Sequence, residues 1–279
     1  MSAVEYASTS QLRVTRLSVV LAIVRRDFLI TRSYRLAFAM DLIVGVINLA
    51  VFFFISRTFD DPGAANLNGA PSYFAFAAIG IAITVVIDAA STTLAGRIRQ
   101  EQLTGTLETL LVQPVTVSEL AFGLAGFPFF FAMIRAVLYL AIGGIWFDVD
   151  LEKLSVLGFV LILVAAGAAF SALGILLGGI VLVVKRGQAV VGMIIYGMTL
   201  VSGALFPVSV LPGWLEPVGR FVPTRFAFDG LRDAVFLGTG WWGDAIALAL
   251  FAAAGIPLAI WVFGQALEYG RRTGSLTEY

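Results

Sequence analysis

A polar stretch, EQLTGTLETLLVQP (residues 101–114), interrupts a chain that otherwise consists of long apolar runs. It carries two carboxylates, three threonines, one glycine and a terminal proline. The chain contains no cysteine and no histidine, which excludes disulfides, thiolate metal sites and the commonest general base. Much ordinary enzyme chemistry is therefore excluded, and the composition alone does not explain why so apolar a chain contains this polar stretch.

Three ionisable residues, Asp41, Asp88 and Arg135, fall inside apolar segments, where charge is costly and often functional. Asp41 and Asp88 lie towards one end of their segments, where water can reach them, so a structural explanation suffices for both. Arg135 lies near the middle of its segment. We expect it to face protein, an aqueous path or a partner carboxylate such as Asp88, in either a functional or a structural role.

The chain has no motif for binding ATP. A phosphate-binding loop requires Gly-x-x-x-x-Gly-Lys-[Ser/Thr], and the two lysines, Lys153 and Lys185, stand in sequences that do not match it. No catalytic, cofactor-binding or metal-binding residue is therefore predicted. Any ATP hydrolysis must come from a second polypeptide.

The composition identifies an all-α integral membrane protein. Hydrophobic residues make up 59% of the 279 residues, charged residues 13%, and the mean hydropathy is +0.96. A helix that crosses the hydrocarbon layer needs about 20 mostly apolar residues. Six segments meet this requirement: 37–56, 72–95, 117–146, 154–184, 188–206 and 244–265.

The distribution of arginine and lysine predicts the orientation. If six spans alternate, twelve basic residues lie on the side of the termini and five on the other, with Arg135 inside a span. Both termini and the stretch 101–114 are therefore expected in the cytoplasm. Formal net charge is zero, so a general attraction to nucleic acid has no support.

The predicted organisation has three parts. A leader over residues 1–36 precedes a transmembrane domain over 37–265, and a cytoplasmic tail covers 266–279. The leader places Leu17, Leu21, Val24 and Phe28 at helical spacing, with arginines on other faces, as in a helix that lies in the headgroup layer. It lacks a small-residue cleavage site, so a removable signal peptide is not expected.

The polar stretch belongs to a predicted cytoplasmic helical segment over 97–113, between spans two and three. Gly105 disfavours a helix interior, so two short helices with a bend fit better than one. Pro114 ends the segment, and Thr116 with Glu119 forms a capping box that starts span three. The segment is thus presented to the cytosol.

Residues 206–236 contain four prolines, which exclude a continuous spanning helix and predict short broken helices. Thr224 can cap one that runs to Phe236, with Arg225, Asp229 and Arg232 on a charged face. Aromatic residues such as Trp214 and Phe221 suit contact with lipid headgroups. A plain extracellular loop against the bilayer remains the alternative.

The sequence RIRQEQLTGTLETLLVQPVTVSELAFG resembles the segment between the second and third spans of ABC-2 type transporter permeases. That pattern is an acidic residue, then Gly-Thr-Leu-Glu, an apolar pair and a proline. The matching residues are Glu101, Gly105, Thr106, Leu107, Glu108, Leu111 and Pro114. The resemblance covers nearly the whole chain, although the leader lacks motifs associated with polysaccharide-exporting members.

The resemblance implies that the segment is a coupling helix that docks on a soluble P-loop ATPase, two copies of which bind ATP and Mg. It also implies a second permease copy, forming a homodimer, with spans one and five lining the path. Residues 206–236 would be re-entrant helices over the outer mouth, with Trp214, Phe221, Arg225, Asp229 and Arg232 as gate residues. The expected location is the bacterial cytoplasmic membrane, in contact with lipid.

The expected function is export of an amphiphilic, drug-like or lipid-linked substrate from the cytoplasm or inner leaflet. Export of a polysaccharide or glycolipid is the alternative within the family. A secondary transporter or channel would show paired broken helices in both halves, whereas the sole interrupted segment is near the end. A lipid-modifying enzyme would need an acidic or histidine cluster, which the sequence does not provide.

Overall fold

The computed structural model describes residues 21, 23–29, 35–58, 67, 69–103, 117–147, 149–183 and 187–273, and these contain helices and turns but no strand. Residues 23–29 of the leader are helical. The labelled elements are α2 (Arg35–Thr58), α3 (Tyr73–Leu103), α5 (Val117–Phe147), α6 (Val156–Val183), α7 (Gly187–Val201), η1 (Val208–Val210), α8 (Glu216–Phe221), α9 (Pro223–Arg232), η2 (Asp233–Leu237) and α10 (Trp242–Thr273).

Five of these helices are long and apolar enough to cross a membrane, which confirms the prediction of an all-α integral membrane protein. Their apolar parts cover 39–58, 73–100, 126–147, 156–181 and 242–270. The fifth predicted span, 188–206, corresponds to α7, whose 15 residues reach about 22 Å. It ends early because the chain turns at Gly203, which has a φ of +82° that other residues rarely adopt. The count of six full spans stays a prediction.

Two helices run further than the sequence predicts. α3 continues to Leu103, so residues 97–103 of the predicted coupling segment are the last turns of span two rather than a separate helix. α10 continues to Thr273, well into the residues assigned to the cytoplasmic tail. Both helices continue through glycines at or near the predicted span ends, Gly96 in α3 and Gly264 and Gly270 in α10, so these glycines do not end them.

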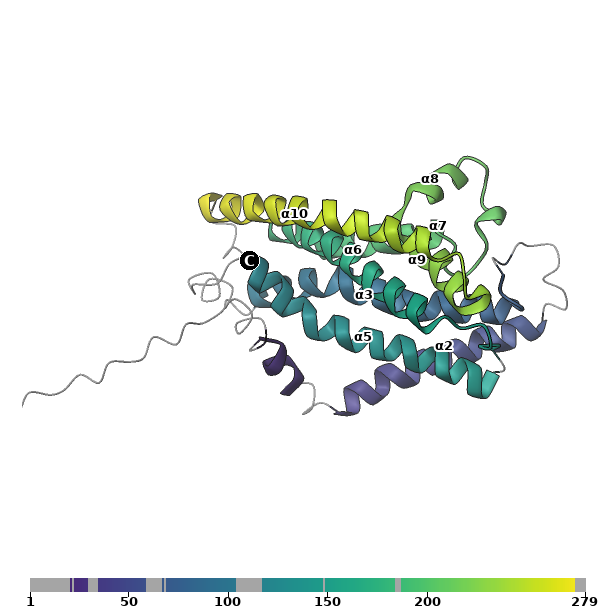
Figure 1. Cartoon of the computed structure of the whole chain (residues 1–279). Helices are drawn as coiled ribbons and strands as arrows, with labels where there is room; N and C mark the ends of the chain where they lie inside the picture. Colours follow the sequence, from purple (N-terminus) through teal and green to yellow (C-terminus); the bar gives the residue numbers. More distant parts are fainter. Residues whose placement is uncertain are drawn as a thin grey trace, which may run out of the picture.

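α3 is the central helix of the bundle and α2 is peripheral. In the most apolar part of α3, 83% of the residues are buried within the protein, whereas in the corresponding part of α2 only 6% are buried. α3 packs between α5 and α6, and α6 packs along α10 (Figure 1). Most of α2 therefore faces outward, which places its few inward contacts with α3 and α5 at the edge of the bundle.

The two ends of the bundle carry different short elements. The leader helix lies at one end, and α8 and α9 lie at the other (Figure 1). α9 continues directly into the π-helical turns of η2 and packs against α3, α6 and α10. The polar residues selected from the sequence are thereby distributed over both ends and the middle of the bundle.

Candidate functional site

A cavity of about 600 Å³ lies between α2, α3, α5 and α7. All three intramembrane ionisable residues, Asp41, Asp88 and Arg135, line it. Its remaining lining residues are Val44, Gly45, Asn48, Phe52, Ile81, Thr84, Val85, Tyr139, Gly192, Ile195, Tyr196, Thr199, Ala204 and Leu205. The volume is within the range of pockets that hold drug-sized ligands.

Arg135 pairs with Asp41 across the α2–α5 contact. The Arg135 Nη1 and Asp41 Oδ2 atoms are 3.7 Å apart, and the two side chains are 20% and 66% exposed. One turn further along both helices, the Tyr139 hydroxyl donates a hydrogen bond to the carbonyl oxygen of Asp41, and its ring packs where a Cβ at Gly45 would overlap it. This close approach holds α2 and α5 in the register that brings Asp41 to Arg135.

The partner of Arg135 differs from the carboxylate named by the sequence analysis. Asp88 lines the same cavity from α3, but the ion pair of Arg135 within the described residues is with Asp41. The α2–α5 register decides between them, because Tyr139 and Gly45 bring those two helices together. The sequence analysis named Asp88 as a possible partner and placed Asp41 towards the end of its segment, so it did not select the carboxylate that pairs with Arg135.

The predicted re-entrant region divides into an exposed part and a buried part. Trp214 and Phe221, before and within α8, are 73% and 81% exposed. α9 instead buries Thr224, Ala227, Phe228, Gly230, Leu231 and Arg232. A loop that merely lies against the bilayer does not describe α9, which is packed within the protein.

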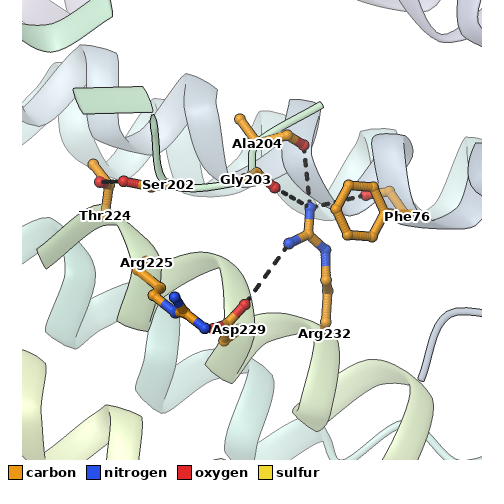
Figure 2. Close-up of polar contacts among 8 residues, drawn as sticks. All are labelled: Phe76, Ser202, Gly203, Ala204, Thr224, Arg225, Asp229 and Arg232. Atoms are coloured by element: carbon orange, nitrogen blue, oxygen red, sulfur yellow. Dashed lines mark hydrogen bonds and ion pairs between the residues drawn. The ribbon is translucent and has the colours of Figure 1, made fainter. Parts of the chain in front are cut away.

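Arg232 lies at the centre of the buried part and is 1% exposed. Its Nη2 donates hydrogen bonds to the carbonyl oxygens of Gly203, Ala204 and Phe76, at 2.8, 3.1 and 3.3 Å (Figure 2). The guanidinium carbon lies 3.5 Å from the centre of the Phe76 ring, a cation–π contact. The side chain thus connects α9 to the turn after α7 and to the first turn of α3.

The charge on Arg232 is offset in part within α9, where one carboxylate lies near two arginines. Arg225 pairs with Asp229 at 3.0 Å, as their spacing of four residues predicts, and Asp229 also lies 4.0 Å from Arg232. Burial lowers the pKa of Arg232 to about 9, and Asp229 opposes that shift. The guanidinium is therefore charged at neutral pH.

Hydroxyl groups add a second connection between α7 and α9, and they correct the predicted helix cap. Val222, not Thr224, is the N-cap of α9, and no side chain caps that helix. The Thr224 hydroxyl instead donates to the carbonyl oxygen of Met198 at 3.2 Å. It also contacts the Ser202 hydroxyl (Figure 2). Both Ser202 and Thr224 are buried. A buried hydroxyl needs a hydrogen-bond partner within the protein, and that of Thr224 finds its partners at the end of α7.

At the opposite end, the leader helix is joined to α3 by a buried carboxylate that the sequence analysis did not select. Asp27 is 1% exposed, and its Oδ2 lies 2.9 Å from Nη1 of Arg97. Ile23 packs against Gly123 of α5, so this face of the leader contacts protein. The one acidic residue among the leader arginines, next to apolar Val24 and Phe28, was the available signal.

Most of the predicted ATPase-docking residues, namely Gly105, Thr106, Leu107, Glu108, Leu111 and Pro114, lie outside the described residues. Glu101 lies in the last turn of α3, four residues after Arg97, which pairs with Asp27 of the leader helix. The end of α3 that precedes these residues is therefore attached to the leader helix.

A comparison with known families decides the class of the protein. The profile of the ABC-2 type transporter family matches residues 18–236. The chain belongs to the ABC-2 type transporter family. The match includes the leader helix, all the residues that line the cavity and the whole of α9. The features described above therefore lie within the family domain.

A curated relative agrees with this assignment. ABC transporter G family member 20 of Dictyostelium discoideum is 30% identical over 147 residues, which is 50% of this chain and 19% of the relative. The matched region thus spans about a fifth of the relative's length. Together with the five membrane-crossing helices, these similarities establish a multi-pass membrane protein of the ABC-2 permease class.

Proposed function

We propose that this chain is the membrane subunit of an ATP-driven exporter and that it moves an amphiphilic, drug-like or lipid-linked substrate out of the cytoplasm or inner leaflet. The observation that carries the proposal is a ligand-sized cavity inside the membrane domain of an ABC-2 family chain. Its wall is mainly apolar, and its three charged groups come from α2, α3 and α5. An amphiphile matches this combination.

The energy would come from two copies of a separate soluble P-loop ATPase that bind ATP and Mg, because the chain has no phosphate-binding loop. The docking residues would be Glu101, Glu108 and the neighbouring segment. Their movement would reach α3 directly, and the Asp27–Arg97 ion pair would carry it to the leader helix. α3 is the central helix, so a shift of its end changes the packing of the whole bundle.

The arrangement in the membrane is part of the same proposal. Two permease copies would form a homodimer in a bacterial cytoplasmic membrane, with both termini in the cytoplasm, as the distribution of basic residues indicates. α8 and α9 would then lie at the outer end, with Trp214 and Phe221 exposed there and Arg232 holding α9 in place.

The first test is co-purification with a soluble P-loop ATPase encoded next to this chain. We expect the wild type to retain the ATPase in stoichiometric amounts and to change its hydrolysis rate in nanodiscs. The double variant Glu101→Ala, Glu108→Ala should lose the ATPase or the change in rate. Glu152→Ala, in the loop between α5 and α6, is the matched control and should behave as wild type.

Equal binding and equal coupling in all three proteins would show that these carboxylates do not contribute to docking. If the wild type binds no ATPase and an ion gradient drives substrate movement, the proposal is wrong and the protein is a secondary transporter.

A further inference from the structure

We propose that the cavity between α2, α3, α5 and α7 binds the ammonium group of a cationic or zwitterionic amphiphile, and that Asp88 is the residue that recognises it. The inference rests on the proposed function, because it names the chemical class of the substrate that the permease would carry. The inference concerns binding of a ligand to the permease, and this binding can be measured without a transport assay.

The charges that line the cavity do not balance. Asp41 and Asp88 contribute two carboxylates and Arg135 contributes one guanidinium. Arg135 lies 3.7 Å from Asp41, whereas Asp88 has no ion pair within 4.0 Å among the described residues and is attracted by Arg135 only from further away. The Asp88 side chain is exposed on the cavity. A carboxylate in an apolar surrounding is stabilised by a cation, so the cavity favours a positively charged ligand.

The hydroxyl groups around the cavity disfavour a sugar. The Thr84 hydroxyl donates to the carbonyl oxygen of Gly80 at 2.7 Å, and the Thr199 hydroxyl donates to that of Ile195 at 2.8 Å. Their hydrogens are thus already used within their own helices. A ligand with many hydroxyls would find neither threonine hydrogen free and would meet a mainly apolar wall, so only part of its hydrogen bonds to water would be replaced.

The apolar and aromatic wall suits the remainder of an amphiphile. Phe52, Tyr139 and Tyr196 line the cavity, and aromatic faces attract an organic cation as well as its apolar body. Val44 and Tyr196 are exposed, so the cavity reaches the surface of the protein between α2 and α7. A ligand can therefore enter with its charged group pointing towards Asp88 and its tail outward.

The test measures binding to the purified permease alone, in an uncharged maltoside detergent, by the fluorescence anisotropy of ethidium. We expect ethidium to bind the wild type and anilinonaphthalene sulfonate, an anionic probe, to bind more weakly. Asp88→Asn should weaken ethidium binding by about tenfold, as loss of one partly buried charge contact does. Asp88→Glu should retain most of the affinity.

Asp150→Asn is the matched control, because Asp150 lies in the loop after α5 and outside the cavity. It should bind ethidium as the wild type does. Size-exclusion chromatography shows whether each variant is folded. The inference is overturned if Asp88→Asn binds ethidium as tightly as Asp150→Asn, or if the anionic probe binds the wild type more tightly than ethidium.

Competition separates the two sources of an ammonium group. Dodecyltrimethylammonium displaces ethidium if the site takes a simple cationic amphiphile, and dodecylphosphocholine displaces it if the site takes a lipid-type headgroup. Failure of both, with ethidium bound, contradicts the inference. The ethidium experiment contains no ATPase, so its outcome is independent of the co-purification test. Failure of ethidium to bind would not affect the ATPase-docking proposal, and failure of ATPase docking would not affect the ethidium result.

Discussion

Two arginines inside the membrane domain have opposite surroundings. Arg232 is fully buried, and one of its nitrogens donates to three backbone carbonyls from two other parts of the chain. Arg135 is partly exposed in a cavity and lies 3.7 Å from Asp41. The comparison teaches that a charge fixed by backbone carbonyls holds structure, whereas one paired loosely beside a cavity contributes little to stability and instead alters the charge of that cavity.

Replacing Arg232 should give the largest loss of stability. Arg232→Ala leaves the carbonyls of Phe76, Gly203 and Ala204 without their donor in a dry site, and we expect the free energy of unfolding to fall by about 3–5 kcal/mol. Thermal unfolding followed by tryptophan fluorescence measures this effect. Arg232→Lys should show an intermediate loss, because an ammonium lacks the planar geometry of a guanidinium over Phe76.

The control is Arg272→Ala at the exposed end of α10, where Arg272 pairs with Glu268. This exposed pair should contribute less than about 1 kcal/mol. Equal unfolding temperatures for Arg232→Ala and Arg272→Ala would show that Arg232 does not hold α9 in place.

A methyl group at Gly80 should disturb the same site with a smaller effect. The Cβ of Gly80→Ala would overlap the carbonyl oxygen of Ala204, an acceptor of Arg232, and would push α3 away from the turn after α7. Overpacking of this kind costs about 1–3 kcal/mol. Gly192→Ala on α7 is the matched control, because its Cβ would have no atom within 4 Å. A lower unfolding temperature for Gly192→Ala than for Gly80→Ala would contradict the prediction.

Replacing Arg135 should have the smallest effect on stability. Arg135→Gln removes a partly exposed ion pair, so we expect a change of less than about 1 kcal/mol in the same unfolding experiment. It also makes the cavity more negative, and ethidium should bind more tightly than to the wild type. A loss of stability as large as that of Arg232→Ala would remove the distinction between the two arginines.

Local patterns in the sequence determined much of the fold. Apolar runs of sufficient length placed five membrane-crossing helices within a few residues of their observed ends, except where helices continue beyond the apolar part. Prolines at regular intervals located the broken segment before α10, and the four-residue spacing of Arg225 and Asp229 predicted their ion pair. The family follows from the motif around Gly105, and the family profile confirms it.

The candidate site could be predicted only in part. The sequence selected Asp41, Asp88 and Arg135 one by one, as charges in apolar segments, but it did not show that they line one cavity. It placed Arg232 on a charged face of a short helix, whereas the structure buries that side chain among carbonyls. Asp27 escaped notice because its partner, Arg97, lies in a different helix.

The sequence by itself determined the class of protein, the positions of the helices and the residues for which burial is costly, because these depend on the chemistry of neighbouring residues along the chain. Only the tertiary structure decided which carboxylate pairs with Arg135 and which carbonyls receive Arg232. Such contacts depend on the rotation and register of helices, and close approaches at Gly45 and Gly80 set these. Phe76 and Arg232 are far apart in the chain, and they meet through helix packing that the spacing of residue types along the sequence does not predict.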